Sequence, residues 1–436
     1  MKTGNSSLID RYFTVWAFAM PITSVVILPS IPGSTAGYLL CFLSLPVALA
    51  CAGTARSRYM VFLLVAVFSW AVMFLGSQLA NAMAPYFPNF TKVVLMDETD
   101  QWTFILRKSL FTQSIYLLAV VLYGAYLYIF FKPSWEQWLL ASATVLALYG
   151  MYEFVYFCVM GKPGDFLTNR AFGADFQNSG GTAEEGNVIG SLFQSVTIHG
   201  FEMPRLKSLT GEPSMYAVSM LPFWIYFNAT SKIRWPVWIL GASLVMSTSS
   251  TAFIGFCVYA LIRLSKLRFN PVKVILGILL LGVVAYVARN YIADMFQQLI
   301  IDKMDGNNVS GAERSDLFRA SLDLWMDGSL ANQLFGIGFG YIRSTDLLTT
   351  MLVNTGLIGT LSLSLLLLYP AFRLDSDVRG TALRQCCVAT WVMLMVSVPE
   401  FAYLAPWTFV AIAYSRLRQQ RFARAYENRQ IDVQLT

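Results

Sequence analysis

Long runs of apolar residues, interrupted by short polar segments, make up most of the chain. Met60 to Leu79 contains no charged residue, and neither does Ser109 to Phe131. A helix of about 20 residues crosses a hydrocarbon core of about 30 Å, so each run is long enough to span a membrane. Runs this apolar must be helical, because lipid holds no water to pair the backbone polar groups. The pattern therefore predicts an all-α polytopic membrane protein.

The runs define about twelve predicted spans, with no linker or separate soluble domain between them. We therefore treat residues 1–436 as a single integral membrane domain. The predicted spans cover residues 12–30, 34–53, 59–79, 109–131, 137–160, 214–230, 236–249, 251–264, 273–291, 346–370, 385–398 and 402–415.

Two apolar stretches, 235–262 and 385–415, could each form one long helix or a pair of shorter ones. Lysines and arginines flank both stretches at both ends. Because short basic loops stay in the cytoplasm, each stretch must return to the side on which it started, which requires a hairpin. We expect the first turn at residues 247–251, a run of serines and threonines, and the second at Pro399 and Glu400.

This topology places both termini in the cytoplasm and three long loops, 80–108, 161–213 and 292–345, on the outer face. Loops longer than about 15 residues are usually functional or disordered, so we expect the second and third loops to carry the activity. The first apolar run contains Pro21 and Pro29 and has no clear small-residue cleavage site. We therefore interpret it as a span and not as a signal peptide.

Composition supports a membrane protein and excludes other classes. Hydrophobic residues make up 56% of the chain and charged residues 13%, against about 25% charged in soluble domains. Basic cytoplasmic segments explain the net charge of +6, and no aromatic-interleaved basic stripe indicates nucleic-acid binding. The chain has one histidine, His199, and its six cysteines all lie in apolar runs. We therefore expect neither a metal site nor disulfides in the long loops.

The second loop runs into the membrane as RLKSLTGEPSMYA, residues 205–217. Glu212 and Pro213 begin a helix there, where proline needs no N–H partner and a carboxylate favours the positive end of the helix dipole. Glu212 is thus either a helix-start charge or a base that faces a substrate cavity at the membrane surface. Arg205 precedes it, and Arg170 lies earlier in the loop. Several converging guanidinium groups suit a diphosphate ligand.

The third loop contains SGAERSDLFRASLDLW, residues 310–325, which predicts a short amphipathic helix with Arg314 and Arg319. We expect its apolar residues Leu317, Leu324 and Trp325 to rest on the membrane surface. The segment LFGIGFG, 334–340, follows with three glycines, which indicate a tight turn or a close backbone approach. Asp346 then stands at the start of the tenth span, as a helix cap or as a catalytic carboxylate.

Residues 170–361 carry these motifs in a familiar order. The order is an arginine with Glu-Pro entering a span, a serine-rich hairpin, an arginine in a late outer loop, GIGFG, and NTGLIG at 354–359. Together they resemble the Wzy-type O-antigen polymerases and their relatives, the O-antigen ligases. Arg170 with Gly181 also resembles an R-x10-G spacing found in outer loops of the polymerases.

The resemblance implies a GT-C-like glycosyltransferase of the bacterial inner membrane. Its donor would be a glycan on undecaprenyl diphosphate, and its acceptor a second lipid-linked repeat unit. Inverting transfer would take place on the periplasmic face without a metal or other cofactor. The expected partners are membrane lipids and a chain-length regulator.

The resemblance also assigns roles to residues of this chain. Arg205 and Arg314 are the expected diphosphate ligands, with Asp346 or Glu212 as the base that activates the acceptor. The remaining residues expected at the substrate are Arg170, Arg319, Arg343 and Tyr216.

Two other functions remain open at this point. Ligases carry a histidine before the GxxG motif, and Thr345 and Asp346 stand at that place here, which favours a polymerase over a ligase. A transporter of lipid-linked sugar is the third hypothesis. Transporters place charges and broken helices near the midplane, whereas this chain concentrates its charges in the outer loops.

Overall fold

The computed structural model describes residues 3–28, 31, 33–50, 54–83, 90–97, 105–170, 194–198, 201–265 and 309–435. The predicted span 273–291, Gly181 and His199 lie outside these residues. The described part is mostly helical, as expected of an all-α protein. Its helices are α1 Thr3–Ala19, α2 Ala36–Ala50, α3 Thr54–Met83, α4 Lys108–Phe130, α5 Glu136–Met160, α7 Pro213–Thr230, α8 Trp235–Met246, α9 Ser250–Leu264, α13 Val309–Met326, α14 Leu330–Phe335, α15 Leu347–Arg373, α16 Val378–Ser397 and α17 Leu404–Leu435.

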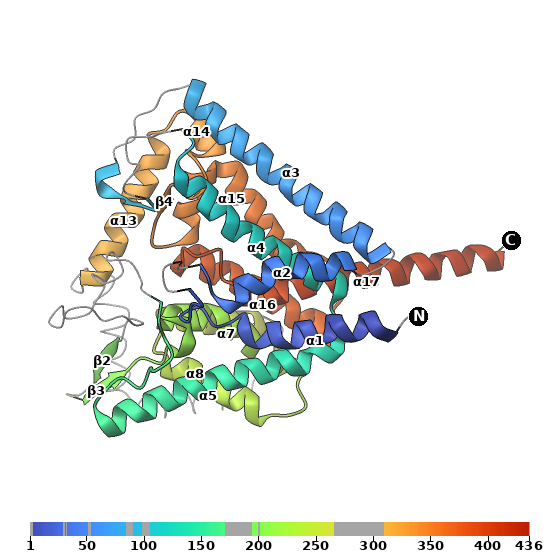
Figure 1. The fold of residues 1–436 in the computed structure, drawn as a ribbon, viewed down its shortest axis with the longest axis horizontal. Helices are drawn as coiled ribbons and strands as arrows, with labels where there is room; N and C mark the ends of the chain where they lie inside the picture. The colour runs from blue at the N-terminus through green and yellow to red at the C-terminus, as the bar shows by residue number, and fades with distance from the viewer. Residues whose placement is uncertain are drawn as a thin grey trace.

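Short elements lie between the helices. Strand β1 (Val94–Leu95) pairs antiparallel with β4 (Ile342–Arg343), and β2 (Ser195–Ile198) pairs antiparallel with β3 (Phe201–Pro204). The 3-10 turns are η1 Phe90–Lys92, η3 Pro133–Trp135 and η4 Ser208–Thr210. The helices run between two ends of the molecule (Figure 1): one carries α13, β2 and β3, and the other carries both chain termini.

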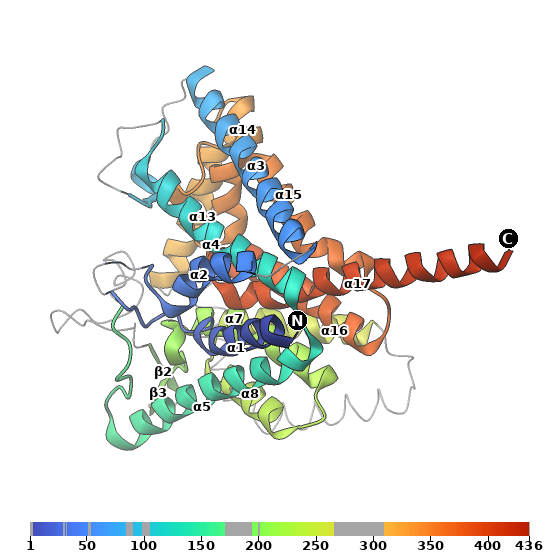
Figure 2. The ribbon, with the colours of Figure 1, turned by 45° about the vertical axis from the view of Figure 1, so that its right-hand side comes forward.

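Among the described residues, four helices are long and apolar enough to cross a membrane: α3, α4, α5 with η3, and α15. Three shorter apolar helices, α2, α8 and α9, accompany them. Helix α3 is nearly unburied along its apolar length and stands away from α1 and α5, beside α4 and α15 (Figure 2). Such an exposed apolar surface is stable only in lipid, so the protein is embedded in a membrane.

The first predicted span, 12–30, is wrong at both ends. Helix α1 begins at Thr3 and ends at Ala19, two residues before Pro21. Proline disfavours helical geometry in the residue before it and cannot donate to the helix ladder, so the helix stops there. The freed backbone continues as an irregular segment whose Thr23 and Ser24 amides both donate to the carbonyl of Leu209, at 3.0 and 3.1 Å. The segment therefore packs against the second long loop.

Both predicted breaks are confirmed. Helices α8 and α9 are separated at Ser247–Ser249, where Thr248 has a positive φ of 42°. Helices α16 and α17 are separated by residues 398–403, which contain Pro399 and Glu400. These turns allow α7, α9 and α16 to pack together.

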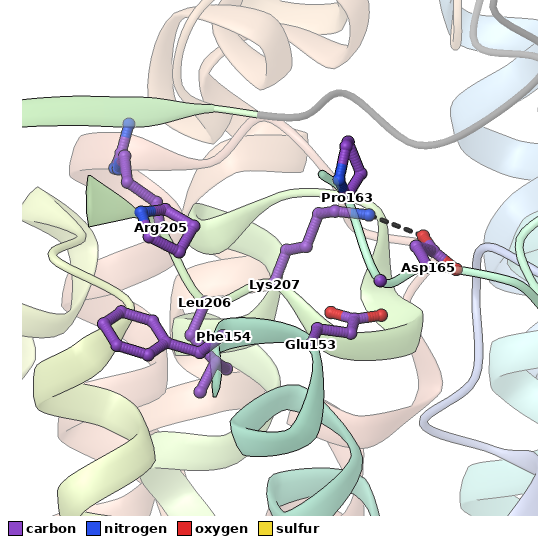
Figure 3. Close-up of a pocket in the computed structure, with 9 residues that line it drawn as sticks. Glu153, Phe154, Pro163, Asp165, Arg205, Leu206 and Lys207 are labelled. Carbon is purple, nitrogen blue, oxygen red and sulfur yellow. Dashed lines mark hydrogen bonds and ion pairs between the residues drawn. The ribbon is translucent and has the colours of Figure 1, made fainter. Parts of the chain in front are cut away.

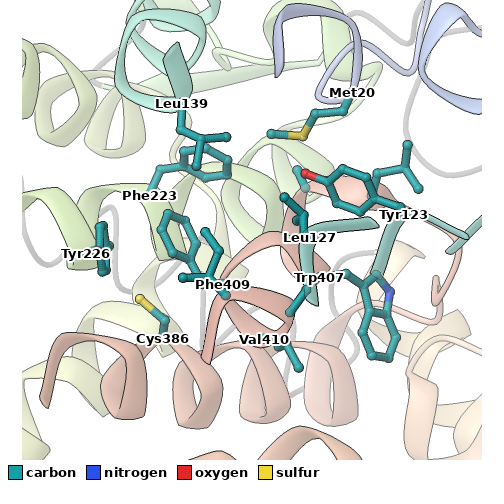
Figure 4. Close-up of a cluster of buried hydrophobic side chains, with 14 of the residues drawn as sticks. Met20, Tyr123, Leu127, Leu139, Phe223, Tyr226, Cys386, Trp407, Phe409 and Val410 are labelled. Atoms are coloured by element: carbon teal, nitrogen blue, oxygen red, sulfur yellow. The ribbon is translucent and has the colours of Figure 1, made fainter. Parts of the chain in front are cut away.

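A core of large apolar and aromatic side chains fills the space between α1, α4, α5, α7 and α17 (Figure 4). Phe409 lies at its centre, with ring centroids 4.8 Å from both Phe223 and Tyr226. Tyr123, also fully buried, shares a hydrogen bond of 2.8 Å with Thr408. Aromatic pairs of this kind add about 0.5–1.5 kcal/mol each beyond the burial of their area.

Ion pairs gather at the end that carries the termini. They join α1, α5, α16, α17 and the short segments before η3 and α16. All are at least partly exposed, so each contributes about 1 kcal/mol or less. The pairs are Asp10–Lys132 at 2.8 Å, Glu136–Arg379 at 3.3 Å, Asp377–Arg416 at 2.6 Å and Asp375–Arg424 at 2.5 Å.

Candidate functional site

Three arginines from separate segments lie within electrostatic range of the carboxylate of Glu212. Arg205 follows β3, Arg314 lies on α13 and Arg343 ends β4. Burial raises the pKa of Glu212 above its ordinary value, while a hydrogen bond from Ser214 (3.0 Å) and the positive charges of all three arginines oppose the rise. The structure thus brings Arg205 and Glu212 of the second loop close to Arg314 and Arg343 of the third loop, which lie more than a hundred positions later in the sequence.

Arg205 is held in place by the second loop and by the α8–α9 turn. Its guanidinium donates to the side chain of Gln194 at 2.7 Å and to the carbonyl of Thr248 at 3.3 Å. Its Nε is buried without a hydrogen-bond partner among the described residues. Burial, with a further contribution from the charge of Arg314, lowers the pKa of Arg205 to about 10. A bound anion would accept a hydrogen bond from this Nε and would offset the buried positive charge of the guanidinium.

Arg343 is positioned by the first long loop and by α15. Its backbone pairs with Val94 across the β1–β4 ladder. Asn354 of α15 holds the neighbouring Ile342 through two hydrogen bonds, of 3.0 and 2.8 Å. The guanidinium of Arg343 lies 3.8 Å from the carboxylate of Glu400. Arg343, in the third long loop, is therefore held in place by a strand of the first long loop.

Arg170, in the second long loop, packs against the irregular segment that follows α1. Its backbone amide donates to Ser24 and its guanidinium to the carbonyl of Thr23, at 3.1 and 3.0 Å. Arg170 and Glu400 both lie within electrostatic range of Tyr38 and Tyr403. The charges of Arg343 and Glu212 also act on Tyr403. Arg170 and Glu400 therefore extend the arginine cluster towards α2 and α17.

Asp346 is the N-cap of α15. One of its carboxylate oxygens accepts the Thr349 amide at 2.8 Å, and the other accepts the Thr349 hydroxyl at 2.9 Å. Burial raises the pKa of Asp346, and these hydrogen bonds oppose the rise. The structure therefore supports the capping role, while Glu212 is the carboxylate on which the charges of the three arginines act.

Two residues expected at the substrate lie away from the cluster. Tyr216 is fully buried and shares a hydrogen bond of 2.6 Å with Ser243 of α8, so it joins two helices in the core. Arg319 is exposed on α13, with no hydrogen bond or ion pair to another described residue. The expectation that Leu324 rests on the membrane surface is wrong: it lies in a buried cluster with Ile337 and Tyr341, so this face of α13 packs on the protein.

The glycine-rich segment after α14 is a packing motif. Helix α15 breaks at Gly356, which has φ 66° and ψ −169°. The amides of Ile337 and Gly338 donate to the carbonyls of Val353 and Asn354, at 2.9 and 3.1 Å. The expected close backbone approach is confirmed. The amides of Ile337 and Gly338 both donate hydrogen bonds within the protein.

A small pocket adjoins Arg205 (Figure 3). Lys207 and Asp165 form an ion pair of 2.6 Å in its wall, with side chains only 6% and 8% exposed. Glu153 of α5 also lines the pocket, and its Oε1 is buried without a hydrogen-bond partner among the described residues. Phe154 and Leu206 supply apolar walls.

The sequence patterns assigned no site role to Glu400 or to three charged residues of this pocket, Glu153, Asp165 and Lys207. Glu153 and Glu400 are isolated carboxylates within apolar runs, which is a signal for function because charge is costly in lipid. Asp165 and Lys207 carried no such signal, since charged residues are ordinary in a loop.

Within the described residues, no three His, Cys, Asp or Glu side chains lie close enough to hold a metal ion. Neither the models of known protein families nor the curated proteins gave a match to this chain. The geometry of the arginine cluster therefore carries the functional argument.

Proposed function

We propose that the protein is a glycosyltransferase that polymerises undecaprenyl-diphosphate-linked oligosaccharide repeat units into O-antigen or a related polysaccharide. The observation that carries the proposal is the state of Arg205. Its guanidinium is desolvated, repelled by Arg314 and incompletely hydrogen-bonded. Such a group is costly to bury alone and becomes favourable when a multiply charged anion occupies the site.

A lipid diphosphate fits this requirement. Guanidinium groups bind phosphate oxygens bidentately, and Arg205 and Arg314 approach from different elements. When the bond between the sugar and the diphosphate breaks, the bonding electrons leave with the diphosphate. Positive charge placed in advance stabilises this developing negative charge, which is often the largest single contribution to catalysis.

Glu212 is the proposed base. The acceptor hydroxyl transfers its proton to Glu212, and its oxygen attacks the anomeric carbon from the side opposite the diphosphate. One glycosidic bond forms, one sugar–phosphate bond breaks, and the configuration inverts. Burial favours protonation of Glu212, while the arginines keep the carboxylate accessible as a base. Arg343 and Arg170 extend the positive surface along which the anionic lipid enters.

The proposed topology has twelve spans in a GT-C-like arrangement, with the arginine cluster at the periplasmic face of a bacterial inner membrane. Two observations support it. The two termini lie at the same end of the molecule, opposite α13, β2 and β3. The end with the termini is also rich in lysine and arginine, as cytoplasmic ends are.

The direct test uses purified protein in lipid nanodiscs, supplied with lipid-linked repeat units and a metal chelator. We expect dimers and longer oligomers on the lipid, and a loss of at least about a hundredfold in rate for Arg205→Ala. Lys162→Ala is the control, because this residue of the same loop is exposed and is not among the charges that act on Arg205 or Glu212.

Other outcomes of this assay would contradict the proposal. Transfer to lipid A–core without oligomers on the lipid would indicate a ligase. Movement of intact lipid-linked units across the bilayer, with no new glycosidic bond, would indicate a transporter.

A further inference from the structure

The arginines of α17 differ in what they contact. Arg416 and Arg424 form ion pairs with two aspartates of the segment before α16, at 2.6 and 2.5 Å. Arg418 has no carboxylate partner among the described residues. Its guanidinium donates to the backbone carbonyl of Ile129 at 3.1 Å and lies 4.9 Å from the ring centroid of Tyr128. The charge of Arg418 is therefore not neutralised by the part of the protein that the structure describes.

The start of α3 brings a second arginine to this place. Arg58 is exposed, and its guanidinium lies 5.3 Å from the ring centroid of Phe422, one helical turn after Arg418 on α17. Figures 1 and 2 both show the start of α3 beside α17. Burial and the positive charge of Arg58 both lower the pKa of Arg418. Two like charges held this close favour an anion that contacts both.

An exposed apolar stripe of α3 begins at Arg58. Val61, Val65 and Phe68 follow it at spacings of three, four and three residues, so all four side chains lie on one face of the helix. The three apolar side chains are 59%, 60% and 70% exposed. Positive charge at one end of an apolar stripe matches an anionic phospholipid, whose phosphate lies at the membrane surface and whose acyl chains lie in the hydrocarbon.

We propose that Arg58 and Arg418 bind the phosphate of an anionic phospholipid, of the phosphatidylglycerol type, whose acyl chains lie along this stripe of α3. Guanidinium groups bind phosphate oxygens through paired hydrogen bonds. A zwitterionic lipid carries the same phosphate, but its ammonium group adds a third positive charge beside the two arginines. Because α3 is nearly unburied along its apolar length, a lipid held in this way would join its start to α17. The proposal does not depend on the enzymatic activity proposed above.

Other occupants match this surface less well. Free phosphate would contact the two arginines but would leave the apolar stripe unused. A second copy of the chain, inserted in the same orientation, would bring its own Arg58 and Arg418 to the same membrane depth, where like charges repel.

Native mass spectrometry of the full-length protein measures the affinity of single lipids. The protein in detergent is titrated with phosphatidylglycerol or with phosphatidylcholine. We expect phosphatidylglycerol to bind at least about fivefold more tightly. Arg58→Gln and Arg418→Gln should each weaken its binding by about fivefold, which corresponds to about 1 kcal/mol for one arginine at an anionic lipid. Binding of phosphatidylcholine should change by less than about twofold.

Arg424→Gln is the matched control. It removes the same charge from the same helix, but Arg424 is paired with Asp375. We expect it to change the affinity for phosphatidylglycerol by less than about twofold. An equal loss in Arg424→Gln and in the two site variants would show diffuse attraction to this basic end of the protein and would overturn the proposal. Equal affinity of the unaltered protein for the two lipids would also overturn it.

Two further measurements address the nature of the ligand and the fold of the variants. Glycerol phosphate has no acyl chains and should bind far more weakly than the lipid, whereas equally tight binding would indicate a site for a soluble phosphate. Phosphatidylglycerol should raise the melting temperature of the unaltered protein more than that of Arg58→Gln. If Arg418→Gln does not fold, Arg58→Gln decides the test, because Arg58 is exposed. Unaltered phosphatidylglycerol affinity in folded Arg58→Gln would contradict the assignment.

Discussion

Gly336 and Gly356 lie back to back, and neither position has space for a side chain. A Cβ on Gly356 would lie 2.6 Å from the nitrogen of Gly336 and 2.3 Å from the carbonyl oxygen of Leu334. This contact locks the segment after α14 into the break of α15. Since β4 and Arg343 follow directly, the glycine contact supports the geometry of the arginine cluster.

Gly356→Ala should destabilise the protein by about 1–3 kcal/mol, because alanine is strained at φ 66° and its Cβ meets backbone atoms. The melting temperature of the protein in nanodiscs measures this. Gly124→Ala is the control, since a Cβ on Gly124 of α4 meets nothing within 4 Å. It should be neutral or slightly stabilising. Equal effects of the two substitutions would show that the glycine contact is unimportant.

Arg314→Ala should slow polymerisation by at least about a hundredfold, whereas Arg319→Ala should change the rate by no more than about twofold. Both arginines are exposed on α13, but only Arg314 acts on Glu212 and Arg205. Steady-state rates with lipid-linked repeats provide the comparison. A large loss for Arg319→Ala with little loss for Arg314→Ala would reverse the assignment.

Glu212→Gln should lower the rate by about 10²–10⁴-fold, as expected when a general base is lost. Asp346→Asn should retain activity and stability, because asparagine is an equally good N-cap, whereas Asp346→Ala should cost about 1 kcal/mol of stability. Rates and melting temperatures of the three variants decide between the two carboxylates. Loss of activity in Asp346→Asn alone would make Asp346 the base.

The pH dependence tests Glu212 in a second way. A base is active when deprotonated, and burial raises the pKa of Glu212, so activity should fall with decreasing pH at a higher pH than for an ordinary carboxyl. The positive charge of Arg314 opposes this rise in pKa. The residual activity of Arg314→Ala should therefore have its acid limb shifted to still higher pH. An unshifted limb would contradict the role of Glu212.

Lys207→Met should destabilise the protein by about 3–5 kcal/mol, because it leaves Asp165 buried without its cation. Arg424→Ala is the control. It removes an ion pair whose side chains are 65% and 45% exposed, and it should cost about 1 kcal/mol or less. Denaturation of both variants under the same conditions gives the comparison. A small effect for Lys207→Met would show that Asp165 finds water or another partner.

The sequence by itself determined the helices and most of their limits. Apolar length and the absence of water in lipid require helices, and basic flanks require the turns at 247–251 and at Pro399, so these features follow from local composition. The first helix begins and ends earlier than the predicted span 12–30. Its end depends on Pro21, which lies inside an apolar run that is continuous in hydropathy.

Only the tertiary structure decided which candidates meet. In the sequence, Glu212 and Asp346 are alike, each an acid at a helix start. The Thr349 hydroxyl and amide donate hydrogen bonds to the two oxygens of Asp346, whereas the charges of arginines from three segments act on Glu212. Capping follows from local spacing, but convergence of charge depends on contacts between distant segments. These arise from packing of the whole chain, and no local pattern encodes them.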